Sequence, residues 1–214
     1  MTRIALIHAL AHSVEPINSE MARTWPEAIR MNLLDDSLSS DLASEGRGLD
    51  EAMHRRFEAL AAYAESTGAQ GILFTCSAFG PCIEAAAARR PHIPVLKPNE
   101  AMIADVAQVD GPVGLIASFE PTLESMPAEF PSHVRLQLAL AEGAMEALDR
   151  GDGPGHDARV ATAARQLQAK GCQAIALAQF SMARAAAVVT AATGLPVFTT
   201  PGSAVSLLRR RLGA

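Results

Sequence analysis

The sequence predicts an α/β protein of two similar lobes, each a parallel sheet covered by helices, with a site in the cleft between them. Short apolar runs alternate with longer Ala-rich segments of helical period along all 214 residues. Strands this apolar, separated by helices, are typical of parallel sheets that are covered on both faces. A segment of the first half also reappears in the second half, and a hydrophobic content of 49% is enough for a substantial core.

The elements alternate in a regular order. Strands are expected at 3–8, 30–35, 70–75, 93–96, 112–117, 133–138, 173–178 and 195–199. Helices are expected near 15–24, 50–67, 80–90, 100–107, 119–127, 139–149, 157–170, 181–193 and 202–212. The stretch GDGPGHD at 151–157 is interpreted as a turn, with Asp157 or a neighbour capping the next helix.

An internal repeat sets the domain organisation. QGILFTCSAFG at 70–80 aligns with QAIALAQFSMA at 173–183, and each is followed by a Pro-Val pair. We therefore expect a first lobe of 1–107 plus 198–214 and a second lobe of 108–197. The alternative is that two βαβ units look alike only through shared composition. Ligands of open parallel sheets bind at the carboxyl ends of the strands, which is why the site is expected between the lobes.

Composition narrows the class of protein. The net charge is −5 and the pI is about 5.7, without a Lys/Arg block, so nucleic-acid binding is not expected. Three cysteines are an odd number and favour a reducing cytoplasm over a disulfide framework. Their spacing is not a zinc pattern, and nucleotide-binding glycine motifs are missing. The apolar run at the start is too short for a signal peptide or a membrane span.

Cys76 is the residue most suggestive of chemistry. It lies where a buried strand gives way to a helix, and a helix amino terminus lowers the pKa of a thiol and holds carboxylates. Thr75 and Ser77 flank it with hydroxyl groups that are expected to bind substrate. The alternative is a buried cysteine that fills a tight junction. Cys82 and Cys172 are interpreted as core residues.

Further candidates lie at other strand ends. His8 ends the first strand and either faces the site or makes one local hydrogen bond. Ser118 and Thr122 follow the matching strand of the second lobe and either hold an anion or, for Ser118, cap a helix. Phe180 and Ser181 follow the second copy of the repeat and complete the substrate-binding candidates.

Several motifs resemble a known family. The two-lobed repeat, TCSAFG at 75–80, PVLKPNEAM at 94–102 and LAQFSMA at 177–183 resemble the aspartate/glutamate/hydantoin racemase superfamily, which includes maleate isomerase and arylmalonate decarboxylase. The resemblance spans nearly the whole chain. It implies a homodimeric enzyme without metal or organic cofactor, which acts on a small carboxylate or dicarboxylate. It also implies two cysteines, one per lobe, that move a proton at a carbon next to a carboxylate or carbonyl.

The chain departs from that pattern at the second thiol. Cys76 falls on the first cysteine position, but Gln179 falls on the second. An amide has no useful proton to exchange near neutral pH, so two-thiol racemisation is not expected. The thiolate could add to an activated double bond or protonate a carbanion, and Gln179 could donate hydrogen bonds to a developing charge. Alternatively, His8 completes an unequal acid/base pair with Cys76.

Three functional hypotheses follow. The first is a cofactor-independent isomerase-, racemase- or decarboxylase-like enzyme that uses Cys76. The second is a non-catalytic binder of small carboxylates that retained the anion site and lost the second thiol. The third is a cysteine hydrolase, which requires His8 within hydrogen-bond reach of Cys76.

Overall fold

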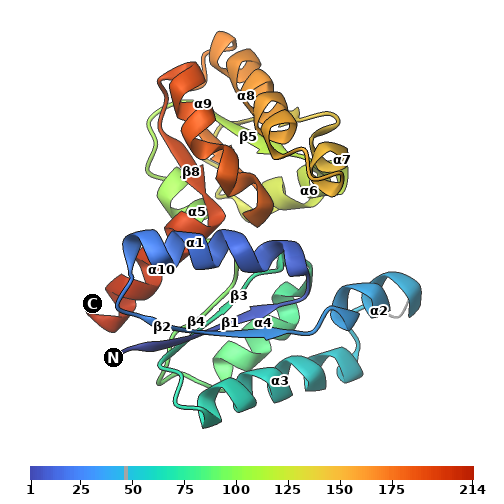
Figure 1. The fold of residues 1–214 in the computed structure, drawn as a ribbon, viewed down its shortest axis with the longest axis vertical. Coiled ribbons are helices and arrows are strands. Elements are labelled where there is room, and N and C mark those ends of the chain that lie inside the picture. Colours follow the sequence, from blue (N-terminus) through green and yellow to red (C-terminus); the bar gives the residue numbers. More distant parts are fainter. Residues whose placement is uncertain (46–47) are drawn as a thin grey trace. The chain divides into compact units, whose positions relative to one another are not determined.

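Strands and helices alternate along the chain as the apolar pattern predicts. The computed structural model describes residues 1–45 and 48–214. The chain forms two units (Figure 1): Met1–Glu100 with Ala204–Ala214 make unit 1, and Ala101–Ser203 make unit 2. The expected boundaries, 107/108 and 197/198, lie some residues away. The reason at the first boundary is that Met102, Ile103 and Val106 bury their side chains against strands of unit 2.

Unit 1 is a parallel sheet between two helical layers. The sheet has four strands in the order β2-β1-β3-β4, all parallel: β1 Arg3–His8, β2 Ile29–Leu34, β3 Gly71–Phe74 and β4 Val95–Leu96. In Figure 1, α1 and α10 cover one face, and α3 and α4 cover the other. The helices are α1 Val14–Thr24, α2 Ser37–Glu45, α3 Glu51–Ser66, α4 Gly80–Ala88 and α10 Thr200–Leu212, with 3-10 turns η1 Ala11–Ser13 and η2 Ser77–Phe79.

Unit 2 has the same architecture. Its four strands run in the order β6-β5-β7-β8, again parallel: β5 Val113–Ala117, β6 Leu136–Leu140, β7 Ala174–Leu177 and β8 Val197–Thr199. The helices are α5 Glu100–Val106, α6 Glu120–Ser125, α7 Ala144–Asp149, α8 Gly153–Ala169 and α9 Ala186–Thr193, with 3-10 turns η3 Met126–Glu129 and η4 Phe180–Ala185. The predicted pair of similar α/β lobes is confirmed.

The repeat holds down to single hydrogen bonds. After β3, the N–H of Thr75 donates to the carbonyl of Ile7 at 3.0 Å, and after β7 the N–H of Ala178 donates to the carbonyl of Ile116 at 2.9 Å. Each bond ties the third strand of a unit to its first strand at the same place. The residue that follows Thr75 is Cys76, and the residue that follows Ala178 is Gln179, so the two occupy equivalent positions.

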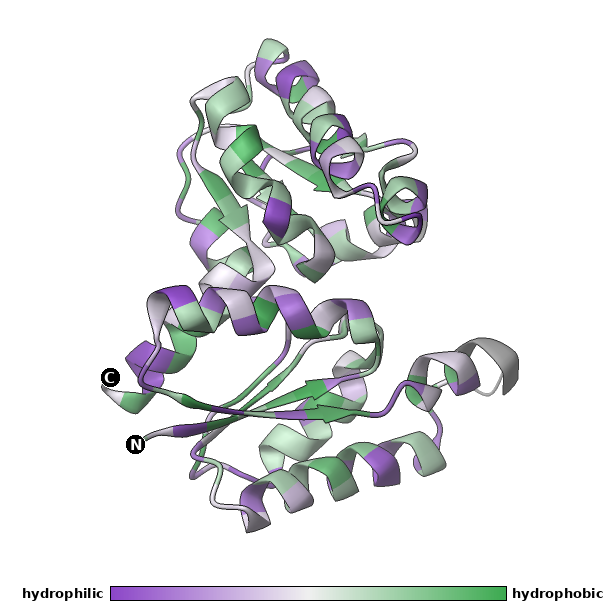
Figure 2. Cartoon of the chain, viewed as in Figure 1, coloured by the Kyte–Doolittle hydropathy of each residue, from purple (hydrophilic) through white to green (hydrophobic). Residues whose placement is uncertain are grey.

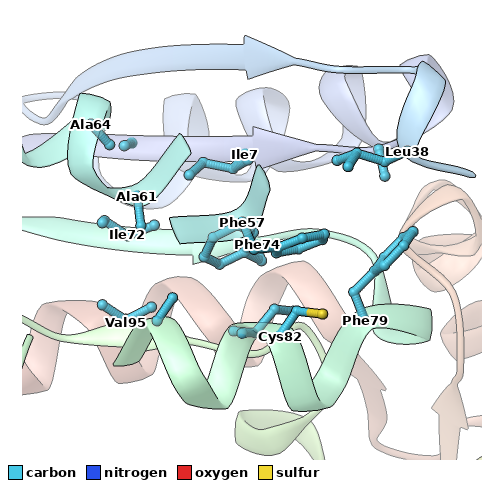
Figure 3. Packing of buried hydrophobic residues seen from close by; sticks show 14 of the residues in the cluster. Ile7, Leu38, Phe57, Ala61, Ala64, Ile72, Phe74, Phe79, Cys82 and Val95 are labelled. Carbon is cyan, nitrogen blue, oxygen red and sulfur yellow. The ribbon is translucent and has the colours of Figure 1, made fainter. Parts of the chain in front are cut away.

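Burial of apolar side chains on both faces of each sheet provides the core. The strands are mainly hydrophobic in Figure 2, and every residue of β3 and β7 is buried. In unit 1, Phe57 of α3 stacks on Phe74 with ring centroids 5.2 Å apart and lies 4.9 Å from the ring of Phe79. Cys82 packs in the same cluster and is 1% exposed (Figure 3), as a core residue should be.

Two helices differ from the expectation. Helix α2 was not predicted, because SLSSDL has few apolar residues; Leu38, 1% exposed, supplies its packing against the core. The stretch 151–157 is not wholly a turn, since α8 begins at Gly153 and its N-cap is Asp152, which accepts from the N–H of Gly155 at 2.8 Å. Asp157 lies inside α8 and instead accepts from Arg184 Nε at 2.9 Å.

The sixth strand is also shifted. It was expected at 133–138 and lies at Leu136–Leu140, so the helix expected from 139 begins only at Ala144. The apolar residues of LQLAL, rather than those of HVRLQL, pair in register with β5, from Val113 opposite Leu136 to Ala117 opposite Leu140.

Candidate functional site

The carboxyl edge of the unit 1 sheet gathers polar side chains from successive strands. The chain leaves β1 at His8, β2 just before Asp35, β3 just before Thr75 and β4 just before Lys97. Because parallel strands end at the same edge, these residues share one border of the sheet. Cys76 therefore lies among polar groups that the sequence brings from distant segments.

Cys76 is held in extended backbone at the start of a 3-10 turn. It is the N-cap of η2, with φ −126° and ψ 121°, and it is partly buried. Burial raises the pKa of its thiol, while hydrogen bonds from the backbone of Ala78 and the side chain of Ser39 lower it less strongly. The expected lowering of the pKa is therefore wrong for this structure, because α4 begins only at Gly80 and the loss of water around sulfur outweighs two donors.

The side chains of His8, Thr75 and Ser13 form one buried network beside the thiol. His8 is 0% exposed, and its Nδ1 lies 2.9 Å from Thr75 Oγ1 and 3.1 Å from Ser13 Oγ. The two hydroxyl oxygens are 2.8 Å apart. Thr75 was expected to bind substrate, but its hydroxyl is buried and bonded within this network. Burial lowers the pKa of His8, although a hydrogen bond to Asn32 opposes the shift.

Two asparagines define the tautomer of His8. Asn18 Nδ2 donates to the carbonyl of Val14 at 2.7 Å and to Asn32 Oδ1 at 2.7 Å. The same Oδ1 lies 3.0 Å from His8 Nε2, so Nε2 carries the proton and donates to it. Nδ1 is then an acceptor, and it takes the hydroxyl proton of Thr75. His8 is thus a neutral imidazole with both nitrogens in use.

In unit 2, Gln179 is oriented by Ser118. Gln179 is the N-cap of η4, with φ −125° and ψ 147°, close to the conformation of Cys76 in η2. Its Oε1 accepts from the backbone N–H of Ser118 at 2.7 Å and from the Ser118 hydroxyl at 2.9 Å. Since a backbone N–H can only donate, the atom facing it must be the amide oxygen. The NH₂ group of Gln179 is left as the donor of this side chain.

The polar network of unit 1 has no counterpart in unit 2. The residues equivalent to His8 and Thr75 are Ala117 and Ala178, both buried. The two strand ends are therefore chemically different although their backbones match. Only the unit 1 copy surrounds its central residue with hydroxyl and imidazole groups.

The remaining predicted residues are spread over both units. Ser77 is exposed, Phe180 is buried, and Thr122 and Ser181 are partly exposed. Ser118 does not cap α6, whose N-cap is Phe119. The structure thus brings together His8, Thr75 and Cys76 in unit 1, and Ser118 and Gln179 in unit 2.

Sequence reasoning missed several groups at this edge. Ser13, Asn32 and Ser39 gave no signal, because each lies far from Cys76 along the chain. Glu100 is different, since it follows β4 inside the segment PVLKPNEAM that carried the family resemblance. Burial raises the pKa of Glu100, against the lowering effect of Arg211 and Lys97. Its position after a strand end was a usable signal.

Two searches of the structure returned nothing. Within residues 1–45 and 48–214, His, Cys, Asp and Glu side chains do not gather in threes that could hold a metal ion. None of the helices in the same ranges is both long and apolar enough to span a membrane.

Two parallel sheets of identical strand order, each with a functional side chain directly after its third strand, define a two-lobed racemase-type α/β enzyme. The chain belongs to the Asp/Glu/Hydantoin racemase family, whose model matches residues 12–208. It is therefore a member of a racemase and isomerase superfamily, as the sequence motifs indicated. None of the curated proteins matches the chain in sequence.

Solved structures share the fold at low identity. The chain is similar to an aspartate racemase homologue from Pyrococcus horikoshii OT3, with 13% identity, a TM-score of 0.76, and 100% of each chain covered. Allantoin racemase from Klebsiella pneumoniae has 20% identity and a TM-score of 0.70, with 100% of this chain and 88% of that chain covered. Glutamate racemase from Francisella tularensis, solved with D-glutamate, has 14% identity and a TM-score of 0.68, with 99% and 81% covered.

Proposed function

We propose that this protein is a cofactor-independent isomerase-, racemase- or decarboxylase-like enzyme that acts at a carbon next to a carboxylate. Cys76 is its nucleophile or acid/base, and Gln179 stands where the family has a second thiol. The observation that supports this most is the placement of Cys76: partly exposed at the carboxyl end of a central strand, with two hydrogen-bond donors directed at its sulfur.

The raised pKa of Cys76 sets what the thiol does at rest. A neutral thiol is a proton donor, so the resting enzyme is prepared to protonate a carbanion. To remove a proton or to add to a double bond, the thiol must first ionise, and Ala78 and Ser39 then stabilise the anion. Base or nucleophilic chemistry is therefore expected to become faster as the pH rises.

Gln179 contributes as a hydrogen-bond donor. Its oxygen is occupied by Ser118, which directs its NH₂ group toward another acceptor. An amide N–H donates well to a carboxylate or enolate oxygen but exchanges no proton with carbon. This supports one-thiol chemistry over racemisation with two thiols. Ser77, Thr122, Phe180 and Ser181 remain proposed substrate contacts.

We assign His8 a positioning role in place of acid/base catalysis. Its two ring nitrogens are bonded to Thr75, Ser13 and Asn32, and the ring is fully buried. It therefore holds the strand end from which Cys76 projects. The same contacts disfavour the hydrolase hypothesis, because His8 would have to break them to reach the thiol. Glu100, with its raised pKa, is a better candidate for a second acid.

The proposed substrate is a small carboxylate or dicarboxylate, bound without metal or organic cofactor. The enzyme is proposed to work as a homo-oligomer in the cytoplasm. A non-catalytic carboxylate binder is the second candidate, and the raised pKa of Cys76 together with Gln179 favours it. The two candidates differ in one respect only, which is turnover.

Proton exchange at carbon tests the proposal. Small amino-acid, dicarboxylate and hydantoin substrates are incubated with the enzyme in heavy water, and loss of the α-proton is followed by NMR. Cys76→Ser should abolish exchange, while the matched control Cys172→Ala, a buried thiol of the other unit, should retain it. Exchange that persists in Cys76→Ser contradicts the assignment. Ligand-induced thermal stabilisation without any exchange supports the binder.

A further inference from the structure

We infer that Ser39 is a further catalytic residue, whose hydroxyl stabilises the Cys76 thiolate, and that Arg56 is the positioning residue that holds Ser39 in place. This inference rests on the proposed function of Cys76. It adds a helix, α2, that none of the sequence motifs contains.

The Ser39 hydroxyl has two acceptors within reach and a single hydrogen. It donates to the carbonyl of Ala9 at 3.1 Å, just past the end of β1, and it also makes a hydrogen bond to Cys76. While the thiol is neutral, the proton can remain on the Ala9 carbonyl. When the thiolate forms, rotation about the Cβ–Oγ bond turns the proton toward sulfur, where the bond is charge-assisted.

Together with the N–H of Ala78, Ser39 makes a two-donor site for negative charge on sulfur. Such donors act most strongly where water is largely excluded, as it is around Cys76. Because both donors are neutral dipoles, they favour the thiolate without forming a fixed ion pair that would hold it in one state. The thiol can thus accept and return a proton during one reaction cycle.

Helix α2 is anchored on both sides of Ser39. On its buried side, Leu38 is 1% exposed and packs in the core cluster with Phe57, as Figure 3 shows. On its outer side, Arg56 of α3 donates to Asp35 Oδ2 at 2.9 Å, to Asp41 Oδ2 at 2.6 Å and to Ser37 Oγ. The guanidinium therefore joins the residues before and after Ser39.

The ionisable groups around this corner are compensated. His8 at the end of β1 is neutral, since burial lowers its pKa. Burial raises the pKa of Asp35, but hydrogen bonds from Ser37 and Arg56 outweigh it and lower the pKa overall. Asp35 and Asp41 are both paired with Arg56. The charge state of Cys76 is therefore set by burial and by the two hydrogen bonds, and Ser39 is the removable one.

Alkylation of Cys76 by iodoacetamide against pH tests the inference, with peptide mass spectrometry to separate it from the other thiols. Ser39→Ala should raise the midpoint by about one pH unit, the size expected for one hydrogen bond to a charged group. Ser39→Thr should restore it. The control is Ser40→Ala, an exposed neighbour whose hydroxyl donates to the carbonyl of Ser37.

Arg56→Leu should move the midpoint in the same direction as Ser39→Ala, because α2 loses its outer anchor. Arg55→Leu is the matched control, since Arg55 is exposed and pairs with Glu51 on the same helix. If Arg56→Leu unfolds, Arg56→Lys takes its place, because lysine cannot bridge two carboxylates in the same way.

An unchanged midpoint in Ser39→Ala overturns the inference, whatever the activity does. If Cys76→Ser abolishes proton exchange while Ser39→Ala keeps the wild-type midpoint, the proposed function stands and the role of Ser39 falls. If Cys76→Ser retains exchange, the proposed function falls, and the alkylation midpoints still decide whether Ser39 stabilises the thiolate.

Discussion

The amide oxygen of Gln179 accepts two hydrogen bonds from Ser118, one from its backbone N–H at 2.7 Å and one from its hydroxyl at 2.9 Å. This pair decides which end of the amide is available. The side chain that replaces a thiol is thereby held as a donor, which gives it a definite and testable chemistry.

Gln179→Glu should lower kcat/KM by about 100-fold, the usual effect of removing one donor to a developing charge. The glutamate is nearly isosteric and still accepts from Ser118, so only the NH₂ donor is lost. Steady-state rates of α-proton exchange measure the effect. Gln173→Glu, at an exposed position, is the control. A variant as active as wild type would exclude a donor role for Gln179.

The pH dependence of the reaction should reflect the raised pKa of Cys76. If the thiolate is the reacting form, kcat/KM rises with pH and is still rising at about 8.5, the value of a free thiol. The reason is that burial keeps the thiol protonated beyond that point. A pH–rate profile on one exchanging substrate measures this. A rate that is already maximal below pH 7 would contradict the raised pKa.

His8 should make the fold less stable in mild acid. Its folded-state pKa is lowered, so below the unfolded value of about 6.5 the unfolded chain binds a proton that the folded chain does not. Stability due to neutral His8 is thus complete above that pH and is lost as the pH falls, at up to about 1.4 kcal/mol per pH unit. Urea titrations at several pH values measure it.

His8→Gln should flatten this dependence between about pH 6.5 and 5. The exposed His12 provides the control, and His12→Gln should keep the wild-type slope. An equally steep slope in His8→Gln would show that another group carries the acid sensitivity.

Phe57→Ala should destabilise the fold by about 3–5 kcal/mol, the range for truncating a buried phenylalanine. Phe57 is 2% exposed and contacts the rings of Phe74 and Phe79. Its loss opens a cavity beneath the strand end that bears Cys76. Chemical denaturation measures the change, and Tyr63→Ala on the same helix, where the side chain is 56% exposed, should cost less than about 0.5 kcal/mol. Similar losses in both variants would contradict the packing.

Much of the fold was legible in the sequence. Runs such as QGILFT and QAIALA declare buried strands locally, and their recurrence declared two lobes of one design. The position of Cys76 at a strand end was legible for the same reason, because a strand end is a local feature. Helix α2 was not legible, since its polar residues carry little periodic signal and one side chain, Leu38, supplies its place in the core.

By itself, then, the sequence determined the strands, the repeat and the pairing of Cys76 with Gln179, all of which depend on short-range patterns of apolar and polar residues. Only the tertiary structure decided how those residues behave. It buried His8 and Thr75 together, brought Ser39 to the thiol and raised the pKa of Cys76. A pKa and a hydrogen bond depend on which groups surround an atom in space, and those groups come from segments that are distant along the chain.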